Sequence, residues 1–367
     1  MSDVKAEDGA MIRRFITSPF SVLDTRLGAW LERKRAWLSL GIESELGRDQ
    51  QLTFNNRDWI KANAEHLTSA QANVKLSTTS IFDPVLTECL IEWFSPQKGR
   101  ILDPFAGGSV RGIVAAKLGR TYYGIELRSE QVAANEQQRQ TICGDSTNPE
   151  WICGDSRVML DFAPEVDMIL TCPPYGHLEV YSDNPADLSY IAKQDHAAFL
   201  TEYRTIVAKA AAKLANNRFA AYVVGDYRDN QGFYRNFTAE TIAAHEACGL
   251  RYYNEAILVK PAGTLALRVT SQMQASRKLG RHHQTVLVFV KGDPKLAAQA
   301  CLLNAPDELG YKHLPTISKP KRSNARRDVS TGVATKLTDE VGSGGSQVSV
   351  ENRVAVDAEP RELGSES

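Results

Sequence analysis

Short apolar runs alternate with segments of helical periodicity between Arg100 and Lys291. Such runs, bounded by turn-forming residues, are typical of β-strands. Seven segments fit this description: Ile101–Leu102, Tyr122–Ile125, Trp151–Cys153, Met168–Thr171, Ala220–Val224, Ala256–Val259 and Val286–Val290. Helical patterns fall between most of them, at Arg111–Leu118, Ser129–Arg139, His196–Leu214 and Ala239–Cys248. The alternation predicts an α/β fold with a seven-stranded, mainly parallel sheet and helices on both faces.

The connection before the seventh run is the exception, because no clear helical pattern occupies it. Parallel neighbours need a long crossover, which is usually a helix. The seventh strand is therefore the one that we expect to run antiparallel.

We expect the 367 residues to form four parts, and composition marks the start of the last one. A main domain is expected at 77–292, since single cores stop growing near ~250–300 residues. An N-terminal extension at 1–76 precedes it, and a short C-terminal appendage at 293–314 follows. From about Pro315 the chain is polar and has few large apolar residues. The tail at 315–367 cannot offset its ordering entropy by burial, and we expect it to be disordered.

The sequence contains neither a membrane span nor a secretory leader by pattern. No apolar run approaches the ~20 residues that cross a bilayer, and the first ten residues are polar and acidic. We therefore expect a cytoplasmic protein without a membrane partner. The six cysteines are scattered and show no metal-ligand spacing, which predicts free thiols and no metal.

Positive charge is concentrated locally, although the formal net charge is only −1. The stretch Lys260–Lys291 contains no acidic residue, and within it Arg277, Lys278 and Arg281 are candidate contacts to nucleic-acid phosphates. A second basic cluster, Arg33–Arg35, lies in the N-terminal extension, which could then also contact DNA. Each cluster alone is as readily explained as a solvated face.

The segment Arg100–Ser109 has the pattern of a strand, a glycine turn and a helix start. Ligands of open α/β sheets bind at the carboxyl ends of strands, where glycine lets the backbone approach them. Glu126 ends the next strand, just over ~20 residues on, where an acid binds both ribose hydroxyls. Asp155, after the third strand, is placed to meet an adenine amino group. The expected cofactor residues in these strands are Asp103, Phe105, Gly107, Glu126 and Asp155.

A nicotinamide-dependent dehydrogenase is the natural competitor, because its glycine fingerprint occupies the same place. Here Asp103-Pro104-Phe105 precedes the glycines, and the third glycine of G-x-G-x-x-G is absent. A ligand without phosphates fits this turn better.

A second candidate site, for a group that accepts a methyl, follows the fourth strand at Cys172-Pro173-Pro174-Tyr175. Methyl transfer to an exocyclic amino group becomes easier when acceptors hold both of its N–H bonds. The carbonyl of Pro173 and a polar atom of Cys172 could do this, while Tyr175 would stack on a base rotated out of the duplex. The plainer interpretation is a turn after a strand.

These motifs resemble the DNA amino-methyltransferases, which methylate adenine N6 or cytosine N4. The family's D-P-F-x-G-x-G looks like Asp103–Ser109, with Ser109 replacing the last glycine, and its Asp, Asn or Ser before Pro-Pro-Tyr is Cys172 here. The segment Ser80–Pro84, which contains Phe82, is similar to the segment that closes over the methionine end of the cofactor. The resemblance covers roughly 77–292. It implies a Rossmann-like methyltransferase fold, S-adenosylmethionine as cofactor, DNA as partner and the gamma order of motifs.

A narrower resemblance is to DNA modification methylases of phages and prophages. It rests on five segments: Pro19–Asp24, Arg33–Trp37, Glu43–Arg48, Leu178–Ser182 and Asp187–Ser189. No long target-recognition domain follows the last strand. The target base, the recognised sequence, a cognate restriction enzyme and the oligomeric state all stay open.

Several further residues are candidates near the acceptor site. We expect the loop after Tyr175 to cover a rotated base, and Asp226 to lie close to it; the acidic and aromatic residues of that loop are Glu179, Tyr181, Asp183 and Asp187. His282 and His283 are expected to meet phosphate or solvent. The rival functions are an RNA or protein methyltransferase and a DNA-binding regulator with a decayed active site.

Overall fold

The structure, a computed structural model, describes residues 11–12, 14–43, 82–263 and 265–302. The predicted tail at 315–367 lies outside these residues, as do Ser80–Ile81 and most of the N-terminal extension. In the part that is described, no helix is long and apolar enough to cross a membrane.

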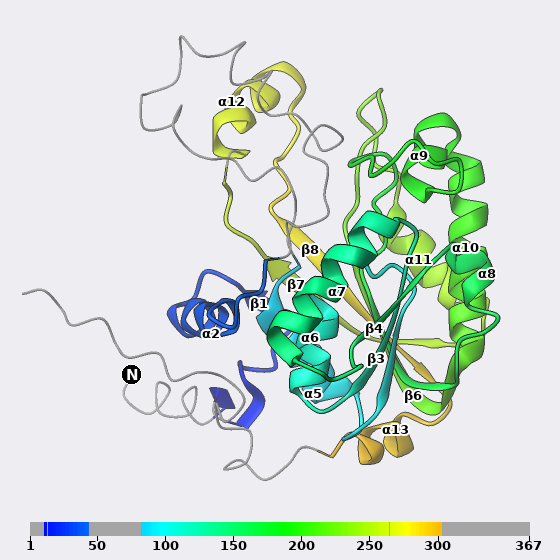
Figure 1. The fold of residues 1–367 in the computed structure, drawn as a ribbon. Helices are drawn as coiled ribbons and strands as arrows, with labels where there is room; N and C mark the ends of the chain where they lie inside the picture. The colour runs from blue at the N-terminus through cyan, green and yellow to red at the C-terminus, as the bar shows by residue number, and fades with distance from the viewer. Residues whose placement is uncertain (1–10, 13, 44–81, 264, 303–367) are drawn as a thin grey trace, which may run out of the picture. The chain divides into compact units, whose positions relative to one another are not determined.

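Within the described residues, the centre of the fold is one eight-stranded sheet (Figure 1). Its order is β1-β7-β8-β6-β5-β2-β3-β4. The strands are β1 (Val22–Asp24), β2 (Arg100–Asp103), β3 (Thr121–Glu126), β4 (Glu150–Cys153), β5 (Val166–Thr171), β6 (Leu214–Val224), β7 (Arg251–Val259) and β8 (His283–Lys291). β8 runs antiparallel to β6 and β7, and all other pairs are parallel. The mainly parallel α/β sheet with an antiparallel last strand is confirmed.

The prediction of seven strands was wrong, because it missed β1 at the edge of the sheet. Leu23 pairs with Leu258 of β7, and the Thr25 N–H donates to the Val259 carbonyl at 3.1 Å. The strand has only three residues, and Val22 is exposed while Leu23 is buried. So short a segment contains no period that sequence analysis could detect.

Helices cover both faces of the sheet, with α5, α6 and α7 on one side and α8, α10 and α11 on the other (Figure 1). Their bounds are α2 (Gly28–Leu38), α5 (Pro84–Phe94), α6 (Val110–Lys117), α7 (Ser129–Cys143), α8 (Ser156–Met159), α9 (Leu188–Gln194), α10 (His196–Lys213), α11 (Phe237–Glu246), α12 (Leu265–Ser276) and α13 (Pro294–Ala300). α12 occupies the connection where no clear helix was expected. None of its described side chains is buried, although Leu265, Val269 and Met273 recur at helical spacing.

Alternating residues of the central strands enter two separate cores. On β5, Met168 and Leu170 pack on one side of the sheet and Ile169 on the other. On β2, Ile101 and Leu102 divide in the same way. Because both faces are buried, the strands are locked in register, and their carboxyl ends meet along one edge.

Candidate active site

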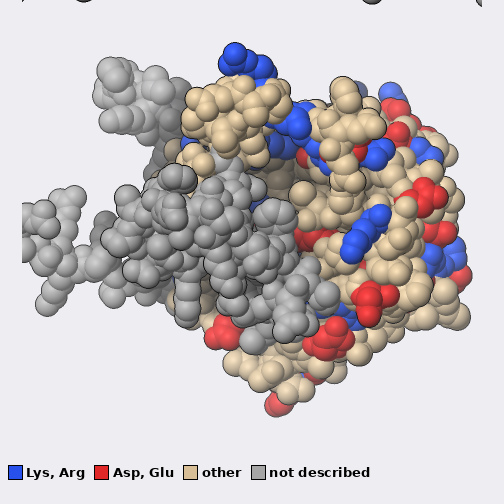
Figure 2. Space-filling view, turned by 90° about the horizontal axis from the view of Figure 1, so that it is seen from above, with Lys and Arg blue, Asp and Glu red and all other residues tan. Residues whose placement is uncertain are grey.

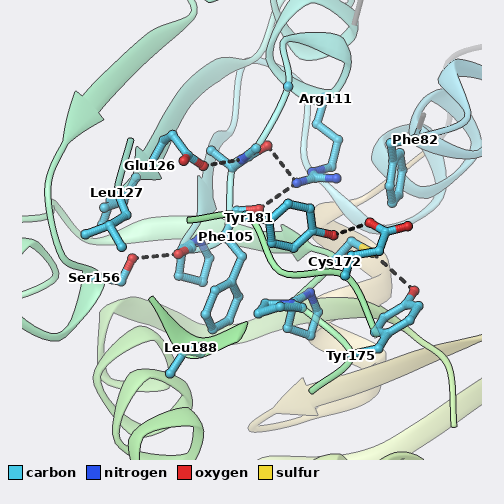
Figure 3. Close-up of a pocket in the computed structure, with 18 of the residues that line it drawn as sticks. Phe82, Phe105, Arg111, Glu126, Leu127, Ser156, Cys172, Tyr175, Tyr181 and Leu188 are labelled. Atoms are coloured by element: carbon cyan, nitrogen blue, oxygen red, sulfur yellow. Dashed lines mark hydrogen bonds between the residues drawn. The ribbon is translucent and has the colours of Figure 1, made fainter. Parts of the chain in front are cut away.

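A pocket of about 310 Å³ opens at the carboxyl edge of β2, β3, β4 and β5 (Figure 3). It brings together nine of the residues predicted from sequence: Phe82, Phe105, Gly107, Glu126, Asp155, Cys172, Pro173, Pro174 and Tyr175. Figure 3 shows Glu126 at one end of the pocket and Cys172 with Tyr175 at the other. The glycine turn and the Pro-Pro-Tyr turn therefore share one cavity, whereas Asp103 does not line it.

Glu126 ties the glycine turn to the end of β3. Its carboxylate accepts the Gly107 N–H at 2.9 Å and the Arg128 N–H at 3.0 Å. Burial raises the pKa of the Glu126 carboxyl, and these backbone donors together with the Arg128 charge act against that rise. A carboxylate has about four acceptor positions, so two remain to bind a ligand.

Gly107 is a residue that the turn requires to be glycine. Its φ of +53° is favourable only without a side chain, and a Cβ there would meet no protein atom within 4 Å. The space in front of it therefore belongs to the pocket rather than to packing.

Asp103 supports the turn from beneath instead of facing the pocket. The carboxylate is fully buried and accepts hydrogen bonds from Arg111 Nε at 2.5 Å, Tyr122 Oη at 2.7 Å and Thr171 Oγ1 at 2.5 Å. Arg111 in turn donates to the carbonyl of Phe105 at 2.8 Å and lies 4.5 Å from the centre of the Phe82 ring. The three side-chain donors to Asp103 come from β3, β5 and α6, and sequence analysis missed all of them.

Asp155 begins α8, where its carboxylate accepts the Arg157 N–H at 2.9 Å. The same carboxylate pairs with the Arg157 guanidinium at 2.6 Å, and that guanidinium also meets Glu202 at 3.0 Å. An amino group that approaches Asp155 would therefore share the carboxylate with Arg157.

At the acceptor end, three partners fix the hydroxyl of Tyr175. Gln284 Nε2 donates to it at 2.6 Å, it donates to the Val223 carbonyl at 3.2 Å, and Cys172 Sγ lies 3.2 Å away. With the tyrosine hydrogen given to Val223, the Cys172 thiol is the donor in the last contact. The sulfur lone pairs then remain available as acceptors. Gln284 was not predicted as a site residue.

Burial disfavours the thiolate form of Cys172. It raises the pKa of the thiol, and the charges of Arg111 and Lys260 only partly oppose this. Lys260, at the end of β7, also lines the pocket, and burial lowers the pKa of its ammonium group. In the sequence Lys260 only begins the acid-free stretch Lys260–Lys291, and it was not predicted to line a pocket.

The loop after Tyr175 borders the pocket, as the sequence indicated. Leu178, Glu179, Tyr181 and Asp187 line it, whereas Asp183 does not. Tyr181 Oη donates to Glu179 at 2.6 Å, and the Tyr181 N–H donates to Ser189 Oγ at 3.1 Å. These bonds hold the loop against the start of α9.

The N-terminal helix α2 supports the segment that enters α5. Trp30 Nε1 donates to Asp83 at 3.2 Å, and Lys34 Nζ donates to the same carboxylate at 3.0 Å. Arg33 is buried and forms a two-pronged ion pair with Glu88. The prediction that Arg33 contacts DNA phosphates was therefore wrong, because its charge is already neutralised inside the fold.

The predicted phosphate-binding residues lie outside the pocket. Arg277 is exposed, Lys278 is half-buried, and Arg281 pairs with Asp226 at 3.7 Å. Asp226 also accepts the Thr238 N–H at 3.0 Å, and it does not line the pocket. Viewed from above, Figure 2 shows a hollow whose surroundings include basic and acidic residues.

A mainly parallel α/β sheet with a pocket at the carboxyl edge of its strands is typical of enzymes that bind a nucleoside cofactor. Residues 35–137 and 166–347, well over half of the chain, match the DNA methylase family, and the chain belongs to that family. Its cofactor is S-adenosylmethionine, and Gly107 and Glu126 offer the open space and free acceptor positions that such a ligand requires. No curated protein matches the sequence.

Solved structures of similar fold include three methyltransferases. TrmN from Thermus thermophilus is 17% identical, with a TM-score of 0.40 over 59% of this chain and 51% of that one. A TehB-like methyltransferase from Corynebacterium glutamicum is 16% identical, with a TM-score of 0.35 over 63% and 99%. Magnesium protoporphyrin IX methyltransferase from Synechocystis is 9% identical, with a TM-score of 0.37 over 65% and 99%. The chain thus spans about half the length of TrmN.

Proposed function

We propose that the protein methylates an exocyclic amino group in DNA, cytosine N4 or adenine N6, on a base rotated out of the duplex. The observation that carries this proposal is the shared pocket, in which the Glu126 end and the Cys172–Tyr175 end face one cavity. Base rotation is required because the target nitrogen is otherwise inside the helix.

In this proposal one end of the pocket binds the cofactor and the other end binds the base. Gly107, Glu126 and Asp155 bind the nucleoside part of the cofactor, Phe82 and Phe105 border it, and Asp103 holds the turn. The cofactor supplies the methyl group as a sulfonium. The Pro173 carbonyl and the Cys172 sulfur accept the amino hydrogens, which draws the nitrogen lone pair out of the ring. Tyr175, fixed through Gln284, stacks on the base.

The same proposal includes the bounds of the catalytic domain and the order of its motifs. The catalytic domain extends over 77–292, and the order of Phe82, the glycine turn and Cys172–Tyr175 along the chain is the gamma order. We also propose a cytoplasmic modification enzyme of phage or prophage type.

Methyl transfer from labelled cofactor tests the proposal. Duplex DNA, RNA and protein are offered separately, the labelled nucleoside is identified by mass spectrometry, and Tyr175→Ala serves as the control. We expect N4-methylcytosine or N6-methyladenine in DNA. Label that enters only RNA or protein would refute the DNA assignment.

Replacing Glu126 with alanine should weaken cofactor binding roughly ten- to a hundredfold. The reason is the loss of hydrogen bonds between a charged acceptor and the ribose, worth about 1.5–3 kcal/mol each. Calorimetry measures the change, and unaltered affinity would contradict the ribose assignment.

Replacing Cys172 with serine should preserve methyl transfer, because a hydroxyl accepts the amino hydrogen bond better than a thiol does. A nucleophilic role would instead require a thiolate, which burial of Cys172 disfavours. Turnover of both proteins is compared by methyl incorporation. Two results together would overturn the amino-methyltransferase assignment: the serine variant folds but is inactive, and the wild-type product is 5-methylcytosine.

Arg277 and Lys278 should account for part of the salt dependence of DNA binding. Changing both to glutamine should reduce the slope of log Kd against log salt by about 0.9 for each phosphate that the variant no longer neutralises. The matched control is Arg281→Gln, since Arg281 is held by Asp226. Fluorescence anisotropy gives the slopes, and a slope that only Arg281→Gln changes would contradict this placement.

A further inference from the structure

The connection between β6 and α11 contains a small hairpin, residues 226–236, that the proposed chemistry does not use; we name it the rim hairpin. Arg228 and Tyr234 pair across it, and the guanidinium lies 3.8 Å from the centre of the tyrosine ring. Asp229 and Phe233 exchange two hydrogen bonds, each 2.9 Å long. Arg228 also donates to the Gly232 carbonyl at 2.8 Å. These contacts hold the tip in one conformation.

The rim hairpin exposes a large apolar side chain to solvent, and its internal hydrogen bonds fix the hairpin backbone. Phe233 is 68% exposed. On the segment after α12, Leu279 is 71% exposed. The two segments meet, because the Lys278 ammonium lies so close to Gly232 that any Cβ there would clash with it. Exposed apolar residues and cations are thus gathered on the same part of the surface.

The start of the rim hairpin, where the chain leaves β6, contacts the Pro-Pro-Tyr turn directly. A Cβ at Gly225 would lie 3.1 Å from the Tyr175 ring, and Gly176 leaves no room for a side chain beneath Tyr227. The Tyr227 ring also meets His177 edge-on at 5.8 Å. In Figure 1 helix α12 lies beyond the upper end of the sheet.

We propose that Phe233 is a wedge that enters the duplex and fills the space left by the rotated base. This inference rests on the proposed function. A rotated base leaves its neighbours unstacked, and proteins offset such a loss by inserting apolar side chains between base steps. An aromatic ring can stack on any base, so a wedge works at any neighbouring sequence. Lys278, which lies beside Gly232 of the rim hairpin, and its exposed neighbour Arg277 supply positive charge for the adjoining phosphates.

The test compares Phe233→Ala with Phe162→Ala, a matched control because Phe162 is also exposed and lies in the turn after α8. Methyl transfer is measured on two duplexes that contain the site found by methylation-sensitive sequencing. The target base is paired in one and mismatched in the other. A mismatched base costs less to rotate, so it needs the wedge less.

We expect Phe233→Ala to lower kcat/KM roughly tenfold on the paired duplex and much less on the mismatched one, with cofactor affinity unchanged and Phe162→Ala active on both. Phe233→Trp should retain activity. An equal loss on both duplexes, or no loss, overturns the wedge alone. Wild-type protein that methylates no DNA overturns the proposed function, and the wedge with it.

Discussion

Replacing Arg111 with leucine should lower the free energy of unfolding by about 3–5 kcal/mol, because it leaves a buried carboxylate without its ionic partner. Asp103 is fully buried, and its ion pair with Arg111 has an N–O distance of 2.5 Å. The Tyr122 and Thr171 hydroxyls remain, but neither carries a compensating charge. Chemical denaturation measures the loss, and cofactor binding should fall with it because Arg111 also holds the Phe105 and Ala106 carbonyls.

The matched control is Arg157→Leu, which removes an arginine from a more exposed carboxylate. The side chains of Arg157 and Asp155 are 22% and 25% exposed. Ion pairs in contact with water contribute about 0–1 kcal/mol, so this variant should be close to wild type in stability. Similar losses in the two variants would show that burial of Asp103 does not determine the effect.

Replacing Tyr175 with alanine should lower kcat/KM for DNA by roughly 5- to 150-fold, which corresponds to the loss of about 1–3 kcal/mol of stacking on the rotated base. The ring lines the pocket and is fixed at its hydroxyl end. Steady-state methyl transfer to duplex DNA measures the change. Cofactor affinity should stay near the wild-type value, since the predicted cofactor residues lie mainly toward the Glu126 end.

Two further variants separate stacking from positioning. Tyr175→Phe preserves the ring and removes the hydroxyl contacts, and Gln284→Leu removes one donor to that hydroxyl. Both should lose far less activity than Tyr175→Ala. If Tyr175→Phe is as impaired as Tyr175→Ala, the hydroxyl rather than the ring is the functional group.

Strands buried on both faces of a sheet are nearly continuous apolar runs, which is why β2, β5, β6 and β8 could be recognised in the sequence. The edge strand β1 was missed because its three residues are too few to show a period. Helix α12 was missed although Leu265, Val269 and Met273 recur at helical spacing.

The glycine turn and the Pro-Pro-Tyr turn were found because each is contiguous in the chain. The side chains that hold these turns in place were not found, because they are distant in the sequence. Thr171 is 68 positions from Asp103, and Gln284 is 109 positions from Tyr175. Arg33 shows the opposite error. A buried ion pair and a solvated basic patch have the same appearance in a sequence, and only the position of Glu88 distinguishes them.

The antiparallel direction of β8 leaves the connection 260–282 at one end of the sheet. Because β8 is antiparallel to β7, the chain that leaves the sheet at Val259 returns to it at His283 on the same edge. Every parallel crossover must instead traverse the sheet to its opposite end. Residues 260–282 can therefore lengthen, shorten or change composition without shifting a strand, and loop closure grows costly only slowly with length. This connection can therefore differ between relatives while the cofactor half of the sheet stays the same.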